Sequence, residues 1–201
     1  MAIKIALAGN PNCGKTTMFN ALTGANQYVG NWPGVTVEKK EGKLKGKKGK
    51  GEEIIVTDLP GIYSLSPYTL EEVVSRDYVL KENPDVIIDL VDATNIERNL
   101  YLTTQLIETG VPVVIALNMA DLLEKRGIKI DTKRLSMLLD CPIIETSALK
   151  GEGLDKLIDE AVKTAKKSSV DLPKEIFTKE MEEAISEVKE VLPSSITEYN
   201  R

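Results

Sequence analysis

The sequence predicts a doubly wound α/β fold with a mostly parallel sheet and one antiparallel edge strand. Along residues 1–150, short runs rich in Val, Ile and Leu alternate with longer segments of helical periodicity. Strands that are apolar throughout are buried on both faces, and strand–helix alternation gives right-handed crossovers between parallel strands. Residues 35–45 instead alternate apolar and polar side chains before a Lys/Gly-rich turn, which is typical of a hairpin.

The expected elements follow the chain in order. The apolar runs predict strands over Ile3–Ala8, Ile54–Thr57, Val86–Val91, Val113–Leu117 and Ile143–Glu145. The helical segments are Thr16–Leu22, Leu70–Lys81, Ile96–Glu108, Leu135–Leu139 and Leu154–Lys166. In the hairpin, Val35–Lys45 turns at Gly46–Gly51 into the strand at Glu52–Thr57.

The alternation of strand and helix patterns ends after Lys167. Ser168–Pro173 reads as a linker, and Thr178–Leu192 as a helix with a single apolar stripe. One helix cannot bury such a stripe alone. We therefore expect a first domain over residues 1–167, followed by a linker and an incomplete helical domain over residues 168–201.

Composition excludes several classes of protein. With 26 basic and 31 acidic residues, the net charge of −5 argues against nucleic acid as a partner. The chain has no histidine, and its two cysteines form no disulfide framework, which indicates a reducing compartment. No apolar run is long enough to span a membrane, so we expect a soluble chain. The seven lysines of residues 39–50 could bind nucleic acid or lipid, but a solvated edge strand explains them more simply.

Residues 9–16 match the pattern GxxxxGK[ST] between an expected strand and an expected helix. Backbone N–H groups of such a loop converge on phosphate oxygens at a helix N-terminus. Lys15 would reach the β- and γ-phosphates, and the Thr16 hydroxyl would coordinate Mg²⁺. The expected phosphate-binding residues are Gly9, Asn10, Pro11, Asn12, Cys13, Gly14, Lys15, Thr16 and Thr17.

Three further motifs follow the ends of later strands: DxxG at Asp58–Gly61, NxxD at Asn118–Asp121, and the pair Ser147-Ala148, called SA. In the DxxG motif, Asp58 can hold Mg²⁺ through water, and the Gly61 N–H can meet a γ-phosphate. In the NxxD motif, the Asp121 carboxylate can accept both N1–H and the N2 amine of guanine, a donor pair that adenine lacks. Each motif alone could be a helix cap or an ordinary loop, but together at the carboxyl ends of successive parallel strands they predict a guanine-nucleotide site. The residues expected there are Gly34, Val35, Thr36, Asp58, Leu59, Pro60, Gly61, Asn118, Met119, Asp121, Ser147, Ala148 and Leu149.

The order GxxxxGKT, a lone Thr, DxxG, NxxD and SA resembles the signature of the P-loop small GTPases. Three stretches narrow the resemblance: Gly30–Glu38, Asp58–Leu65 and Arg98–Thr103. They resemble the cytosolic GTPase domain of the prokaryotic ferrous iron transport protein B family. This resemblance implies a partner in the membrane-embedded iron-permease region of the same full-length protein, a place on the cytoplasmic face of the cell membrane, and a possible homo-oligomer. Residues 170–201 resemble the start of that family's helical, nucleotide-dissociation-inhibiting domain.

The resemblance also assigns roles in hydrolysis. Thr36 is the expected switch residue, with its hydroxyl on Mg²⁺ and its N–H on the γ-phosphate. Ile62 replaces the water-orienting Gln of Ras-like enzymes, so intrinsic turnover should be slow. Resemblance to potassium-activated GTPases suggests that the Asn12 oxygen and the carbonyls of Gly30 and Trp32 hold K⁺. The expected catalytic residues are Asn12, Lys15, Thr36 and Gly61.

Several alternatives stay open at this stage. The Asn12 side chain could make only a loop-stabilising hydrogen bond, and Cys13 is better explained as a small neutral filler than as a thiolate. Met119 stands where Lys is usual and should pack over the base. Trp32 is expected in a mobile loop rather than in the core. Rival functions are a soluble ribosome-assembly or tRNA-modification GTPase and a non-catalytic nucleotide-sensing module.

Overall fold

The computed structural model describes residues 2–24, 27–45, 52–167 and 181. Its strands are β1 (Ile3–Gly9), β2 (Gln27–Asn31), β3 (Glu38–Lys43), β4 (Ile54–Asp58), β5 (Val86–Asp92), β6 (Val113–Asn118) and β7 (Ile143–Glu145). Its α-helices are α1 (Lys15–Thr23), α2 (Leu70–Lys81), α3 (Ile96–Glu108), α4 (Ala120–Lys125), α5 (Thr132–Leu139) and α6 (Leu154–Ala165), and a 3₁₀ turn, η2 (Ala93–Asn95), precedes α3.

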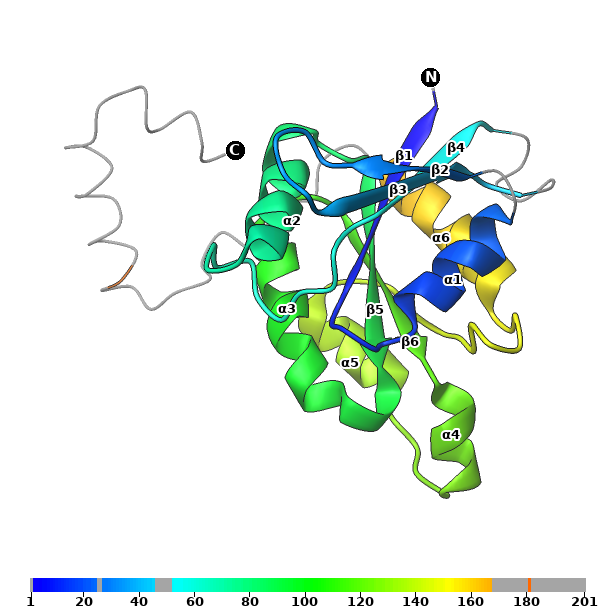
Figure 1. The fold of residues 1–201 in the computed structure, drawn as a ribbon. Helices are drawn as coiled ribbons and strands as arrows, with labels where there is room; N and C mark the ends of the chain where they lie inside the picture. Colours follow the sequence, from blue (N-terminus) through cyan, green and yellow to red (C-terminus); the bar gives the residue numbers. More distant parts are fainter. Residues whose placement is uncertain (1, 25–26, 46–51, 168–180, 182–201) are drawn as a thin grey trace.

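The strands form one sheet in the order β2-β3-β4-β1-β5-β6-β7. Strands β4, β1, β5, β6 and β7 pair in parallel, whereas β3 runs antiparallel to both β4 and β2. Helices cover both faces of the sheet (Figure 1). The predicted doubly wound fold with an antiparallel edge is therefore confirmed.

Alternation along the buried strands separates two cores, one on each face of the sheet. In β1, Ile5 and Leu7 point into a core with α1 and α6, while Ala6 and Ala8 point into a core with α2 and α3. Both sets of side chains are almost fully buried. Because the central strands are covered on both sides, a site is expected at the ends of the strands, and ligands of such folds bind at the carboxyl-terminal ends.

The structure adds two elements that the sequence did not predict. The edge strand β2 carries exposed Tyr28 and Val29, so it lacks the buried run that reveals the central strands. Helix α4 is only six residues long, too short for a helical period to be recognised. The turn expected at Gly46–Gly51 and the helix expected at Thr178–Leu192 lie outside the described residues. Within the part of the chain that is described, no helix is long and apolar enough to cross a membrane.

A carboxylate lies in the centre of the sheet. Asp89 on β5 is 1% exposed and accepts one hydrogen bond, 2.6 Å long, from the Thr103 hydroxyl of α3. Burial raises the pKa of the Asp89 carboxyl from its ordinary 3.8 to about 6, and the Thr103 hydrogen bond opposes this shift only in part.

We expect Asp89 to make folding stability depend on pH. Because its folded-state pKa lies above the unfolded value, the stability present near pH 4 is lost as pH rises through 6. The loss should be about 2–3 kcal/mol. Asp89→Asn should remove this decline, and Thr103→Val should steepen it, in urea unfolding measured between pH 4 and 8. If wild type and Asp89→Asn show parallel pH profiles, Asp89 does not titrate in this range.

Candidate functional site

The predicted phosphate loop connects β1 to α1 and lines a cavity of 490 Å³. The cavity is bordered by Asn10, Pro11, Asn12, Gly14, Lys15, Thr16, Thr17 and Gly61. Gly14 has φ +93°, and a Cβ there would lie 2.5 Å from the Asn118 Nδ2 atom. Only glycine fits this position, because both the backbone conformation and the close approach exclude a side chain.

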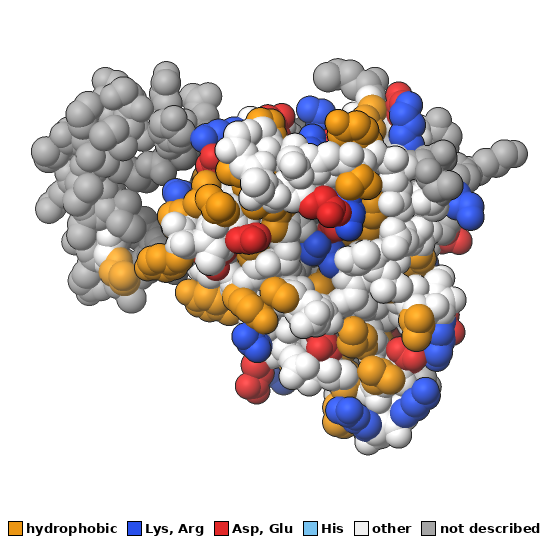
Figure 2. Space-filling view, in the orientation of Figure 1, with side chains coloured by type: hydrophobic (Ala, Val, Ile, Leu, Met, Phe, Trp, Pro, Cys, Tyr) orange, Lys and Arg blue, Asp and Glu red, His pale blue; other side chains and the backbone are white. Residues whose placement is uncertain are grey.

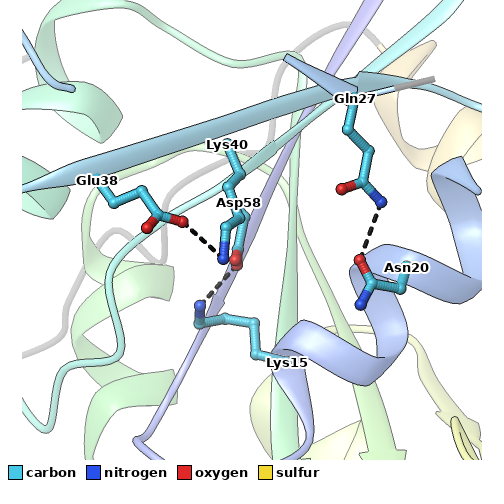
Figure 3. Close-up of polar contacts among 6 residues, drawn as sticks. All are labelled: Lys15, Asn20, Gln27, Glu38, Lys40 and Asp58. Atoms are coloured by element: carbon cyan, nitrogen blue, oxygen red, sulfur yellow. Dashed lines mark hydrogen bonds and ion pairs between the residues drawn. The ribbon is translucent and has the colours of Figure 1, made fainter. Parts of the chain in front are cut away.

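Lys15 and Asp58 join the phosphate loop to the end of β4. The Lys15 Nζ atom lies 2.6 Å from the Asp58 Oδ1 atom, with both side chains about nine-tenths buried. Figure 3 shows the two side chains pointing toward one another, with Lys40 nearby. Lys40 is itself paired with Glu38 at 2.7 Å. Burial raises the pKa of the Asp58 carboxyl, and the charge of Lys15 acts against that rise.

The oxygen donors at this end of β4 suit a magnesium ion. Asp58 is a buried carboxylate whose nearest cation is Lys15. The residue that follows Lys15 in the sequence is Thr16, which is exposed and offers a hydroxyl oxygen. A Lys15 ammonium that turned to a phosphate would leave this carboxylate without its partner, and a hard divalent cation would compensate it. The third predicted ligand, Thr36, lies exposed in the loop before β3.

Asn118 ties three of the predicted motifs together. Its Nδ2 donates to the Cys13 carbonyl at 2.9 Å, and its Oδ1 accepts from the Ala148 N–H at 3.0 Å. Thr146 donates a longer bond of 3.5 Å to the same oxygen. Asn118 is 2% exposed, so these bonds are screened little by water. The phosphate loop, the NxxD motif and the SA motif therefore form one site, as their order in the sequence predicts.

Asp121 is held by a cation that the sequence analysis did not identify. The Lys150 Nζ atom lies 3.1 Å from the Asp121 Oδ2 atom. The hydrogen bond from Lys150 lowers the pKa of the Asp121 carboxyl, so this group is ionised at neutral pH. Lys150 lies in the tight turn after Ser147, where its backbone N–H donates to the Ser147 carbonyl. No local sequence pattern indicates that its side chain forms an ion pair with Asp121.

Two substitutions in the signature are accommodated by packing. The Met119 Cε atom lies 3.8 Å from where a Cβ on Gly14 would stand, so this side chain extends over the phosphate loop. Cys13 is 1% exposed, and burial, followed by the charge of Asp89, raises the pKa of its thiol to about 12. A neutral thiol that fills space fits the preferred interpretation of Cys13.

The prediction for Trp32 is wrong. Trp32 is 8% exposed and packs edge-on against Tyr78 of α2, with ring centroids 5.3 Å apart. Two backbone bonds fold the loop back, from the Trp32 N–H to the Val37 carbonyl and from the Val35 N–H to the Trp32 carbonyl. This turn places the indole in the core despite its polar neighbours in sequence. The indole Nε1 finds no hydrogen-bond partner among the described residues, which is costly for a buried donor.

Of the three residues predicted to hold K⁺, Asn12 has a side chain without a hydrogen-bond partner among the described residues, whereas Gly30 and Trp32 are engaged in backbone pairing. Asn12 has φ +66° and an exposed side chain that makes no hydrogen bond within the described part of the chain. The loop-stabilising bond considered for Asn12 is therefore not observed. Gly30 pairs with Lys39 in the edge of the sheet, and the Trp32 carbonyl is engaged by Val35.

The DxxG motif approaches the phosphate loop closely. A Cβ on Gly61 would lie 3.2 Å from the Pro11 Cα atom, so the two loops touch backbone to backbone. The Ile62 N–H donates to the Gly9 carbonyl at 3.3 Å, and the Ile62 side chain is buried in the core. Of the other predicted residues, Leu59 and Ser147 are buried, Gly34 has φ +77°, and Leu149 is 88% exposed.

Comparisons with known proteins agree with this arrangement. Residues 3–161 match the family described as ferrous iron transport protein B. The chain is 52% identical over 158 residues to a fusion of Fe(2+) transport protein A and Fe(2+) transporter FeoB from Porphyromonas gingivalis, covering 78% of this chain but only 18% of that protein.

Two solved structures are similar over nearly the whole chain. A mutant of S. thermophilus NFeoB bound to mGDP is 52% identical with a TM-score of 0.89, covering 100% of this chain and 75% of that one. The cytosolic domain of the T. maritima FeoB iron transporter in its GMPPNP form is 43% identical with a TM-score of 0.85, covering 94% and 73%. With its motifs gathered at one end of the sheet and its sequence matched over residues 3–161, the chain belongs to the ferrous iron transport protein B family.

Proposed function

We propose that this chain binds guanine nucleotides and hydrolyses GTP as the regulatory domain of a ferrous iron transporter. The observation that carries the proposal is the set of hydrogen bonds made by the Asn118 side chain. They join the predicted phosphate loop to the NxxD and SA motifs, which are suited to guanine. Related structures described as bound to mGDP and in a GMPPNP form support the same reading. Asp121, ionised beside Lys150, supplies the carboxylate that guanine's two donors require.

Nucleotide binding would begin with an exchange of ionic partners. Lys15 would leave Asp58 for the β- and γ-phosphates, while the backbone N–H groups of residues 12–16 enclose them. Mg²⁺, held by Thr16, Thr36 and, through water, Asp58, would neutralise charge that develops on the phosphate oxygens. The Gly61 N–H would orient the γ-phosphate from the other side.

Hydrolysis by this chain alone should be slow. Ile62 is buried and has no polar atom with which to orient water, and no arginine lies in the phosphate loop or in Gln27–Lys40. The free Asn12 oxygen supports a K⁺ site, completed by the carbonyls of Gly30 and Trp32 once the Trp32–Val37 turn opens. The buried Ile62 is also what favours the rival function, a sensing module that binds nucleotide without turning it over.

The wider assignment rests on the relatives. The chain spans about a fifth or less of the transporters it matches, so the iron-permease region of the full-length protein is the proposed partner. For this domain we propose a position on the cytoplasmic face of the membrane, with residues 1–167 as the GTP-binding domain and residues 168–201 as a linker and incomplete helical domain. Association into a homo-oligomer is compatible with this arrangement.

Replacing the proposed guanine acceptor tests the assignment of the base. In Asp121→Asn, the amide presents a donor where guanine also presents donors, so GDP affinity should fall by about 2–4 kcal/mol. Xanthosine diphosphate, which carries an oxygen in place of the guanine amine, should gain affinity. Isothermal titration with both nucleotides measures the exchange. Lys150→Gln is the companion variant, because it removes the partner of Asp121 and leaves the carboxylate. If Asp121→Asn weakens both nucleotides equally, the guanine assignment is wrong.

The single tryptophan reports on the proposed switch. If Thr36 is drawn to Mg²⁺ and the γ-phosphate, the Trp32–Val37 turn must open and Trp32 must leave Tyr78. Trp32 emission should then shift to longer wavelength with a non-hydrolysable GTP analogue and not with GDP. Thr36→Ala should abolish the difference while GDP affinity is retained. An identical spectrum in the two nucleotide states would contradict a switch in this loop.

A further inference from the structure

Three lysines of the lysine-rich segment at residues 39–50 are paired with carboxylates in the fold. Lys39 pairs with Glu41 at 3.1 Å, Lys40 with Glu38 at 2.7 Å, and Lys43 with Glu53 at 2.5 Å. Surface pairs of this kind contribute little stability, but they cancel the charge that would attract an anionic partner. These three paired lysines are therefore poor candidates for a basic binding surface.

Helix α5 presents an unusual outer face. Met137 and Leu138 are each 75% exposed, although core-facing helices normally turn such residues inward. Lys133 and Arg134 precede them by four residues, so the two cations and the two apolar side chains lie next to one another on one face. Leu139, by contrast, is partly buried against the core on the α2 and α3 side of the sheet.

The loop that leads into α5 carries further exposed side chains of the same two kinds. Ile128 is 51% exposed, and Lys129 beside it is exposed as well. Figure 2 shows basic and hydrophobic side chains close together on the lobe formed by α4 and the loop after it, whereas α5 itself lies behind the sheet in this orientation. We name Ile128, Lys129, Lys133, Arg134, Met137 and Leu138 the basic–apolar surface.

Within the described residues, the cations of this surface have no ionic partner. Lys129, Lys133 and Arg134 form no ion pair with any residue in the described ranges. The nearby Asp131 carboxylate accepts from the Arg134 backbone N–H as the cap of α5. Unpaired cations interleaved with long aliphatic side chains suit a boundary where anionic headgroups meet acyl chains. The surface has no aromatic residue on which a nucleic-acid base could stack.

We propose that the basic–apolar surface docks peripherally on anionic lipid bilayer. The cations would lie among the headgroups, while Met137, Leu138 and Ile128 reach the outer part of the acyl region. The relatives that the chain matches are transporters several times its length, which supports a bilayer close by. The proposal does not depend on which nucleotide the chain binds.

Flotation of the 201-residue chain with lipid vesicles tests the proposal. Vesicles of phosphatidylcholine with phosphatidylglycerol are compared with vesicles of phosphatidylcholine alone, at low and raised salt. We expect binding only to the anionic vesicles, weakening as salt screens the headgroups. Lys133→Gln/Arg134→Gln should weaken partition roughly twenty-fivefold, since each cation near an anionic surface contributes about fivefold. Met137→Gln/Leu138→Gln should weaken it at least about tenfold.

The control removes the same charge elsewhere. Lys43→Gln/Lys163→Gln replaces two lysines that are paired with Glu53 and Glu160, and it should leave partition unchanged. Thermal unfolding of each variant shows whether the fold is retained. Absence of binding to anionic vesicles, equal binding to neutral ones, or equal weakening by the control would each overturn the proposal. Concentration-dependent dimerisation that Met137→Gln/Leu138→Gln abolishes, without lipid binding, would assign the surface to a second copy of the chain instead.

Discussion

Asn118→Ala is expected to destabilise the chain and to lower its affinity for GDP roughly thirty- to seven-hundredfold. The substitution leaves the buried Cys13 carbonyl and Ala148 N–H without their partner, at a cost of about 2–4 kcal/mol in the free energy of unfolding. The same amount of binding free energy corresponds to a loss of roughly thirty- to seven-hundredfold in affinity. Urea unfolding and titration calorimetry measure the two effects separately.

Asn99→Ala is the matched control for this variant. Asn99 is also buried, and its side chain accepts from the Asp92 N–H and donates to the Asn95 carbonyl, so it joins α3 to the end of β5. Its removal should destabilise the fold by a comparable amount while GDP affinity changes far less. If both variants lose affinity in proportion to stability, Asn118 is a structural residue and not the organiser of the site.

Asn12→Ala is expected to remove a stimulation of GTP hydrolysis by K⁺ that we place at roughly ten- to a hundredfold over Na⁺. Positive charge near the transferred phosphate is required, and a cation held by the Asn12 oxygen would supply it because neither the phosphate loop nor Gln27–Lys40 contains an arginine. Binding of GDP should persist, because Lys15 and the backbone of the loop remain.

A second variant separates loss of the oxygen from backbone strain. Asn12 has φ +66°, which costs alanine roughly 1–2 kcal/mol but costs glycine almost nothing. Asn12→Gly should therefore lose the K⁺ response as completely as Asn12→Ala. If K⁺ still accelerates hydrolysis by the glycine variant, the side-chain oxygen is not a ligand, and the charge must come from a partner protein.

The sequence predicted the fold well where burial leaves a pattern in it. Strands β5 and β6 are apolar nearly throughout because helices cover both faces, and α2 begins where Thr69 and Glu72 form a capping box. The edge strand β2 was not predicted because a segment with exposed Tyr28 and Val29 has no pattern that distinguishes a strand from a loop. Local patterns are weakest at the margins of a sheet, where only one face is buried.

The candidate site was predicted in its motifs but not in its internal pairings. Lys15 and Asp58 lie 43 residues apart in the chain, and Asn118 and Cys13 lie 105 apart, so their contacts depend on the completed sheet. Trp32 was misplaced for a related reason: its polar neighbours suggested an exposed loop, whereas Tyr78 of α2 provides its buried contact. Such contacts follow from tertiary packing, which a linear pattern does not contain.

Phosphate release by the unmodified chain tests the central claim most directly. Turnover should be measured with GTP and with ATP, in KCl and in NaCl at equal ionic strength, with Mg²⁺ present. The account predicts slow hydrolysis of GTP that K⁺ accelerates, and much weaker use of ATP at nucleotide concentrations that leave the site unsaturated. Equal turnover of GTP and ATP would contradict the guanine site, and an absence of hydrolysis with GTP in KCl would contradict the assignment as an enzyme.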